Sequence, residues 1–288
     1  MTVAATTETG ARPARAGRRP SVPGWVGVVP FFAYVGVFLV LPTGIVITDA
    51  LKNPSGAWQL SNITELGNPL VRTYFAGSLK LCLITAVGGA LFGAILAYAV
   101  STGNPDGMVR RLYVAFSGVL AQFGGVTLAF AFLALLGPAG LLFHASWYFT
   151  FPWGISLIYL YFQIPLMVLI FMPAIDGLKI QWREASESLG ASAWQYWRHV
   201  GAPLLAPAFL GSALLLFANA LSAFATIEAW ESQVAYIVPQ QISISLSSEV
   251  GLSNINYADV LALGMIIMVA VIMTLYALLQ RRASRWLR

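Results

Sequence analysis

Few residues in this sequence are placed to carry out covalent chemistry. Each of the three lysines follows a leucine, whereas a phosphate-binding loop needs a lysine directly after a glycine. The motifs Gly-x-Ser-x-Gly and His-Glu-x-x-His are absent, and the single cysteine, Cys82, lies in an apolar run. His144 and His199 are far apart in the chain. No catalytic residue, no metal site and no ATP hydrolysis by the chain itself is therefore predicted.

A few polar side chains could instead line a path for a solute. They stand inside or just after long apolar stretches, and are Gln122, Gln163, Asn219 and Ser222, followed by Glu228 and Glu231. The two glutamates, with Asp259, could form an acidic mouth that favours a cationic solute. The alternatives are hydrogen bonds between helices for the four neutral residues and a solvated loop for the acids. An ion-coupled carrier would keep charges within its spans, and their scarcity here favours transport driven from outside the chain.

The elements that must position these residues are membrane helices. The chain has 288 residues, of which 58% are hydrophobic and 9% charged, whereas a soluble domain has about 25% charged residues. A helix that crosses a bilayer needs about 20 apolar residues. The sequence therefore predicts an all-α membrane protein with six spans, at about residues 25–48, 74–101, 112–136, 154–174, 204–226 and 260–279.

Details within and between the spans follow from glycine, proline and aromatic residues. Gly88, Gly89 and Gly93 should let the second span pack closely against a neighbour, and Pro30 and Pro42 should bend the first. Residues 137–140 should end the third span. Residues 147–153 are typical of an aromatic belt, and residues 228–259 are expected to be a polar outer loop.

The orientation follows from the basic residues, which mark the cytoplasmic side. All of the 16 Lys and Arg residues except Lys52, Arg72 and Lys80 lie in the two terminal segments, in the connection after the second span, or in the central segment around residue 190. Both termini and this central segment are therefore predicted to be cytoplasmic. Residues 1–23 should form a disordered basic tail before the permease domain, residues 24–288.

The central segment from Glu184 to Pro207 is the one polar, patterned stretch in the middle of the chain. Gly190 suits the left-handed position just past a helix end. Ser192 followed by Gln195 predicts a capping box and a second helix. Gly201 and Pro203 are expected to end that helix, with Pro203 in the first turn of the next one.

This segment resembles the EAA loop of ABC importer permeases. The resemblance rests on Glu184-Ala185, Leu189-Gly190-Ala191-Ser192, Trp194, Gln195, Arg198, Val200 and Pro203, and departs from the usual pattern at Ser186 and Ala202. It implies a type I importer permease fold, in which residues 176–203 form a cytoplasmic loop that docks on the ATP-hydrolysing subunit. The docking residues that it implies are Glu184, Ala185, Gly190, Ala191, Trp194, Arg198 and Pro203. An interfacial amphipathic helix is the alternative.

The stretch from Phe31-Phe32 to Pro42 and the ending from Tyr257 to Arg288 look most like the spermidine/putrescine branch. The resemblance implies a bacterial inner-membrane location, a second permease subunit, two ATPase subunits that bind ATP and Mg, and an extracytoplasmic solute-binding protein. It implies no cofactor in this chain. Together with the acidic mouth, it makes a polyamine or a similar organic cation the expected solute. The alternatives are a stand-alone carrier or channel and a structural membrane scaffold.

Overall fold

The computed structural model describes residues 28–52, 55–104, 107–137, 140, 150–230, 237–247 and 255–284. Regular structure within them is helical, apart from one isolated bridge between Lys52 and Trp58. This confirms the predicted fold class. Contacts divide the chain into two units, Met1–Ile45 and Val46–Arg288, and the predicted tail at residues 1–23 lies outside the described residues.

Helix α1 (Val29–Val35) continues through a π-helical turn (Gly36–Val40) into α2 (Leu41–Ala50), within which the first unit ends at Ile45. In the π turn the Leu41 N–H bonds to the Gly36 carbonyl, five residues back. The helix therefore passes through Pro42, which has no N–H to donate, without ending. Exposed side chains such as Phe31 and Phe38 are typical of a surface that faces lipid.

The second unit is built of helices of very different length. After a 3₁₀ helix (Leu60–Gly67), they are α3 (Pro69–Ser101), α4 (Met108–Gln122), α5 (Val126–Leu136), α6 (Trp153–Asp176), α7 (Ile180–Ser188), α8 (Ala193–Tyr196), a π turn (Trp197–Gly201), α9 (Ala202–Ser222), α10 (Phe224–Ala229), α11 (Val238–Ser247) and α12 (Ile255–Ser284). Among the described residues, five helices are long and apolar enough to cross a membrane, or six if the bent pair α4 and α5 is counted as one span.

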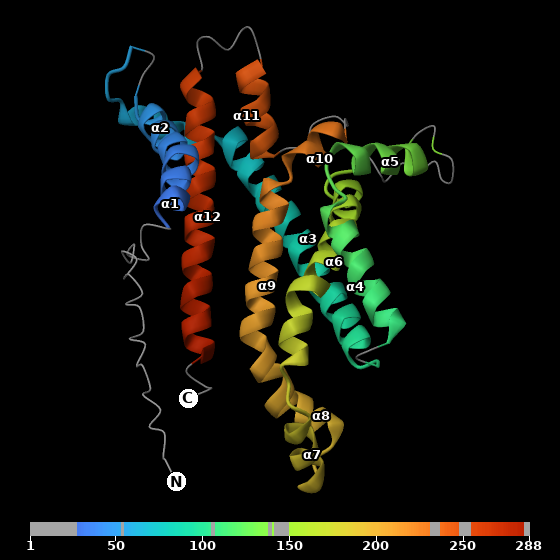
Figure 1. Ribbon diagram of the computed structural model, residues 1–288. Coiled ribbons are helices and arrows are strands. Elements are labelled where there is room, and N and C mark those ends of the chain that lie inside the picture. Colours follow the sequence, from blue (N-terminus) through green and yellow to red (C-terminus); the bar gives the residue numbers. More distant parts are fainter. Residues whose placement is uncertain are drawn as a thin grey trace, which may run out of the picture. The chain divides into compact units, whose positions relative to one another are not determined.

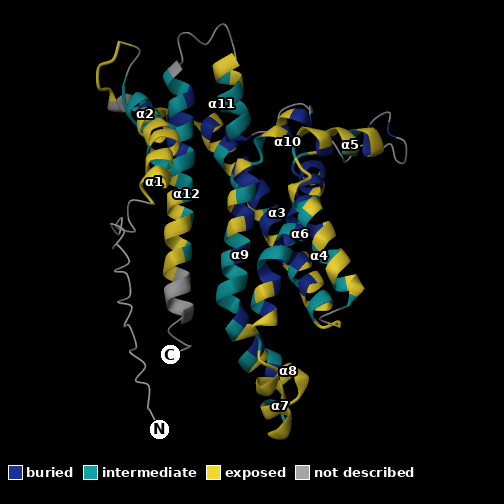
Figure 2. Ribbon diagram, viewed as in Figure 1, coloured by how far each residue is buried: buried dark blue, intermediate teal, exposed yellow. Residues whose placement is uncertain are grey.

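The core of this unit lies where α3, α6 and α9 pack side by side (Figure 1). Their facing sides are buried, whereas α7 and α8 beyond their ends are mostly exposed (Figure 2). Leu81, Tyr159, Met167 and Leu216 from the three helices are each at most 2% exposed. In a bilayer this packing is held by van der Waals contact and by small residues, because lipid is as apolar as the core.

Two glycines of α3 permit the close approach of α6, as the sequence predicts. A Cβ atom on Gly93 would lie 2.4 Å from Cβ of Met167 and 2.8 Å from the carbonyl oxygen of Ile164. A Cβ on Gly89 would lie 2.9 Å from both Gln163 and Leu216. No side chain fits at these positions unless the helices move apart.

Gly93→Ala is therefore expected to lower the stability of the purified protein in detergent by about 1–3 kcal/mol, the usual cost of overpacking. Gly118→Ala in α4 is the matched control, because nothing lies within 4 Å of its Cβ position. Thermal unfolding followed by circular dichroism measures both variants. Equal melting temperatures would contradict the close packing of α3 on α6.

The third span predicted at residues 112–136 is not one continuous helix, because α4 and α5 meet at an angle of 97°. The break falls at Phe123-Gly124-Gly125, before the predicted end at Gly137. Gly125 has φ 73°, a left-handed conformation that a continuing helix excludes. Its N–H donates to Oγ1 of Thr226 at 3.1 Å, so a residue 101 positions away stabilises the break.

The prediction that residues 228–259 are a loop is also wrong in part. They contain α11, and α12 begins at Ile255. Val238, the first residue of α11, is fully buried with Val71, Tyr74 and Leu261. Its N–H donates to Oγ of Ser78 at 3.0 Å. A short apolar cluster therefore anchors a helix whose sequence looks polar.

Candidate coupling site

Residues 176–203, named here the coupling loop, form a tight helix–turn–helix beyond the ends of α6 and α9 (Figure 1). Helix α7 ends at Ser188, and Gly190 adopts φ 78°. The Gly190 N–H bonds to the Glu187 carbonyl at 2.9 Å and the Ala191 N–H to the Ser186 carbonyl at 3.0 Å. These two bonds are a Schellman motif, which confirms the predicted role of Gly190.

The predicted capping box starts the second helix. The Gln195 N–H donates to Oγ of Ser192 at 3.3 Å, and the Ser192 N–H donates to Oε1 of Gln195 at 2.7 Å. Both N–H groups belong to the otherwise unpaired first turn of α8. The turn between α7 and α8 is thus closed by bonds within the loop itself.

The prediction that Gly201 and Pro203 end this helix is wrong, since helical structure continues from Ala193 to Ser222, whereas the prediction that Pro203 lies in the first turn of the next helix, α9, is confirmed. The π turn Trp197–Gly201 explains the difference. The Ala202 N–H bonds to the Trp197 carbonyl, five residues back, so the wider turn accommodates the missing N–H of Pro203. A Cβ on Gly201 would lie 2.7 Å from the indole of Trp197, so the glycine makes room for that ring.

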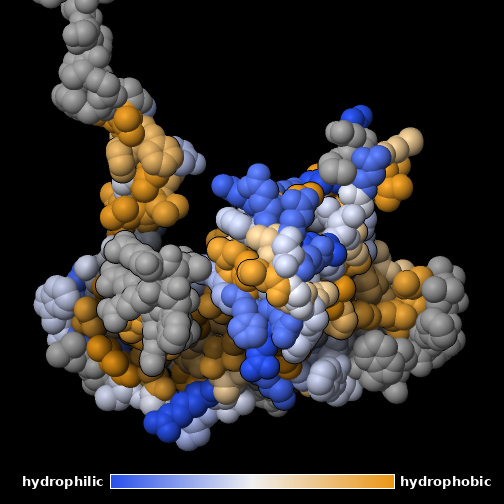
Figure 3. Space-filling model, turned by 90° about the horizontal axis from the view of Figure 1, so that it is seen from below, coloured by the Kyte–Doolittle hydropathy of each residue, from blue (hydrophilic) through white to orange (hydrophobic). Residues whose placement is uncertain are grey.

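The coupling loop exposes large apolar side chains. Trp194 is 72% exposed, Leu189 87% and Ile180 72%. Seen from below, hydrophobic and hydrophilic surface alternate over this end of the second unit (Figure 3). An exposed apolar patch with a polar rim is typical of a surface that binds another protein.

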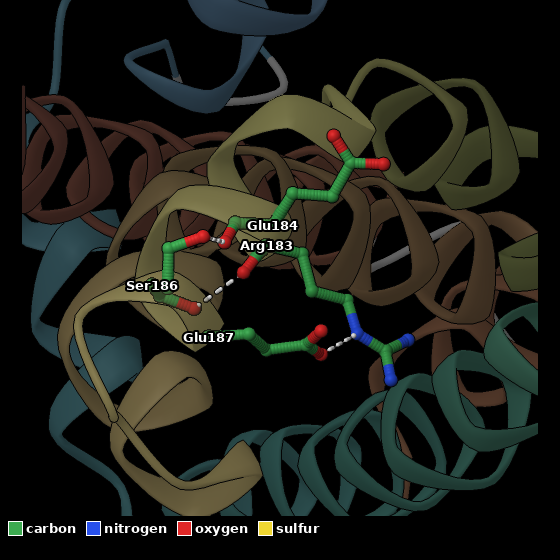
Figure 4. Close-up of polar contacts among 5 residues, drawn as sticks. Arg183, Glu184, Ser186 and Glu187 are labelled. Carbon is green, nitrogen blue, oxygen red and sulfur yellow. Dashed lines mark hydrogen bonds and ion pairs between the residues drawn. The ribbon is translucent and has the colours of Figure 1, made fainter.

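Charged side chains complete this surface. Nε of Arg183 bonds to Oε1 of Glu187 at 2.9 Å one turn along α7. This hydrogen bond and the negative charge of Glu187 raise the pKa of Arg183. The Glu184 carboxylate points away from that pair (Figure 4) and is exposed. It is therefore available to a basic partner.

The other docking residues predicted from the sequence lie on the same segment. Ala185 is exposed on α7, Arg198 and Pro203 are exposed in the π turn and the start of α9, and Ala191 is half-buried. Ser186, where the sequence departs from the usual pattern, donates from Oγ to the Arg183 carbonyl at 2.8 Å. The serine is thus satisfied within its own helix.

The residues predicted to line a path are divided between two places. Gln163 is fully buried between α3 and α6, where its Nε2 donates to Oγ1 of Thr85 at 3.2 Å. This bond between α6 and α3 is the alternative role that the sequence indicates for Gln163. That Gln163 lines a solute path stays a prediction.

Gln122 and Ser222 are the last residues of α4 and α9, where both helices break. Both side chains are exposed, and Asn219, one turn before Ser222, is half-buried. Besides the bond from Gly125 to Thr226, the Tyr159 hydroxyl donates to the Ala223 carbonyl at 2.7 Å. The first of these bonds ties the break between α4 and α5 to α10, and the second ties α6 to the break after α9.

Of the predicted acidic mouth, Glu228 is exposed on α10. Glu231 lies outside the described residues. Asp259 lies within α12. The mouth therefore stays a prediction.

The model of one protein family matches residues 89–288, which include the coupling loop and both broken helices. That family is described as the inner-membrane component of binding-protein-dependent transport systems. The chain belongs to this family. It is accordingly an ABC importer permease and a multi-pass protein of the bacterial inner membrane.

Curated relatives of the permease are distant and match between about two thirds and nine tenths of its length. It is 24% identical to the sulfate transport system permease protein CysT of Escherichia coli (strain K12) over 270 residues, which cover 88% of this chain and 90% of CysT. It is 28% identical to a probable molybdenum ABC transporter permease protein of Haloferax volcanii over 202 residues, 69% of this chain and 72% of that protein.

Solved structures agree on the fold. A chain of a bacterial ABC transporter that imports the acidic polysaccharide alginate matches with a TM-score of 0.69 and 16% identity, covering 90% of the permease and 94% of that chain. A chain of the MetNI methionine ABC transporter matches with a TM-score of 0.53 and 16% identity over 75% of the permease and 98% of that chain. Sequence and structure thus place this chain in the same fold.

The docking residues predicted from the sequence do not include every exposed apolar residue of the coupling loop. Leu189, which is part of the pattern that carries the resemblance, and Ile180 are both exposed on this segment, and the sequence contains the signal: both are large apolar residues in the one polar segment. Asp176 was also missed as a contact residue. Its partners are 66 and 75 residues away, and no local pattern reveals them.

Proposed function

We propose that this chain is the transmembrane subunit of an ATP-driven importer and that its coupling loop docks on the ATPase subunit. The complex would contain two ATPase subunits, a second permease subunit and an extracytoplasmic binding protein. The observation that carries the proposal is the coupling loop: a self-capped helix–turn–helix that exposes Trp194, Leu189 and the Glu184 carboxylate. Such a surface is costly in water unless a partner covers it.

The docked loop would transmit ATP-driven closure of the ATPase dimer to the spans. Because α7 continues from α6 through a short turn and α8 continues into α9, a displacement of the loop acts directly on two of the three core helices. The spans would then change from inward-facing to outward-facing, and the binding protein would deliver its solute. This arrangement favours the importer over a stand-alone carrier, which has no use for an exposed apolar loop.

For the solute we propose a small oxyanion such as sulfate or molybdate. The support comes from the names of the relatives, which are sulfate and molybdenum permeases. A polyamine, expected from the sequence, finds no support in those names. It retains one observation in its favour, the exposed acid Glu228 on α10.

The test is to co-purify the complex with its binding protein in lipid nanodiscs and to measure ATP hydrolysis with sulfate, molybdate or spermidine as the added solute. We expect sulfate or molybdate to raise the rate several-fold and spermidine to leave it unchanged. Stimulation by spermidine alone would show that the solute is a polyamine and not an oxyanion. Failure of any ATPase subunit to co-purify would contradict the importer itself.

A further inference from the structure

The coupling loop does not rest flat on the ends of the spans. A cavity of about 670 Å³ separates them. Its lining comes from the inner ends of α3, α4 and α6 and from both halves of the loop, and includes Arg110, Asp176, Lys179, Arg183 and Trp197. Besides the packing of α3 and α4 along α6, the contacts at the edges of this cavity connect the loop to these two helices.

One of these contacts joins three helices through a single carboxylate. Asp176 is the last residue of α6 and the first of the coupling loop. One of its oxygens accepts a hydrogen bond from the Ser101 hydroxyl at the end of α3, and the other pairs with the Arg110 guanidinium in the first turn of α4. We name these three residues the clasp. Both carboxylate oxygens are thereby used, by residues distant in sequence.

Both charges of the clasp stand at the unfavourable end of their own helix. The C-terminus of a helix is negative and disfavours Asp176, while the N-terminus is positive and disfavours Arg110. Neither charge therefore stabilises the helix to which it belongs. The pairing between the helices compensates both, since each charge neutralises the other across the cavity edge.

A second contact ties the other half of the loop to α3. The rings of Tyr98, one turn before Ser101, and of Trp197 in the π turn lie edge to face, with centroids 5.1 Å apart. The end of α3 therefore contacts the coupling loop where it leaves α6 and again where it enters α9. Of these two contacts, the clasp is the one that includes α4.

We infer that Asp176 is a positioning residue that makes α3 and α4 follow the coupling loop when the loop moves. The assignment rests on the proposed function, because the ATPase supplies that motion. Without the Asp176 carboxylate, α6 and α9 still move with the loop because they are covalently continuous with it. Helix α4, however, has lost the ion pair that connects it to the loop. The broken span α4–α5, with Gln122 at its bend, would then respond only partly to ATP.

The experiment measures the distance between spin labels at Val119→Cys in α4 and Gln181→Cys in α7, by double electron–electron resonance on the purified complex. The native Cys82 is 2% exposed, so labels go to the introduced sites. We expect one narrow distance distribution, equal without nucleotide and with ATP and vanadate. Asp176→Asn should broaden the distribution about twofold and make it depend on nucleotide.

Three further variants distinguish a positioning role of Asp176 from a general loss of structure. Glu187→Gln breaks an ion pair within α7 with the same change in charge and should leave the distribution narrow. Asp176→Glu should retain it. The exchange Arg110→Asp with Asp176→Arg should restore it, since each charge then also suits its helix end.

A wild-type distribution in Asp176→Asn, with and without nucleotide, would overturn the inference. So would an exchange variant as broad as Asp176→Asn. If ATPase subunits do not co-purify, the proposed function fails, while the distribution of the permease alone still shows whether the clasp holds α4 to the loop.

Discussion

Gly190→Val is expected to separate the permease from its ATPase while leaving the membrane helices folded. Gly190 has φ 78°, a conformation that a β-branched residue rarely adopts and that costs about 1–3 kcal/mol when forced. Nothing lies within 4 Å of its Cβ position, so the effect comes from the backbone alone. Relaxing the strain would break the Schellman bonds and change the angle between α7 and α8.

The measurement is the amount of ATPase that co-purifies with the tagged permease. A loss of docking free energy of about 1.4 kcal/mol weakens binding roughly tenfold, and we expect at least that for Gly190→Val. Gly190→Asn is the matched control, because asparagine tolerates the left-handed conformation. The expected order is glycine, then asparagine, then valine. Equal recovery of the ATPase from all three would show that the turn does not shape the docking surface.

The coupling loop could be predicted in detail because its determinants are local. A capping box spans four residues and a Schellman motif six, and Ser192, Gln195 and Gly190 specify both without help from the rest of the chain. The same holds for the apolar spans, whose length and composition alone indicate a membrane helix. Gly89 and Gly93 likewise indicate a close contact, although not the helix that makes it.

Features that depend on tertiary contacts could not be predicted. The break between α4 and α5 is fixed by Thr226, and only the fold brings it to Gly125. Pro203 looks like a helix end, but a π turn absorbs its missing N–H, and no local signal distinguishes the two outcomes. Ser101 and Arg110, the partners of Asp176, lie beside it only because α3, α4 and α6 pack together.

Trp194→Ala is expected to weaken docking about as strongly as the change in the turn, but by a different mechanism. The side chain is 72% exposed, so its removal costs the free permease little. At an interface a buried tryptophan is among the residues that contribute most, and its truncation typically costs about 2 kcal/mol or more. That is roughly a thirtyfold loss of affinity for the ATPase.

Trp58→Ala is the matched control, since Trp58 is 70% exposed and lies between α2 and the 3₁₀ helix, outside the coupling loop. Titration of the purified ATPase onto permease in nanodiscs gives the affinity of both variants, and their melting temperatures should equal that of the wild type. A Trp194 variant that binds as tightly as the Trp58 variant would remove the indole from the docking surface. Docking would then depend on Leu189, Ile180 and Glu184, and the turn at Gly190 would act by orienting those three.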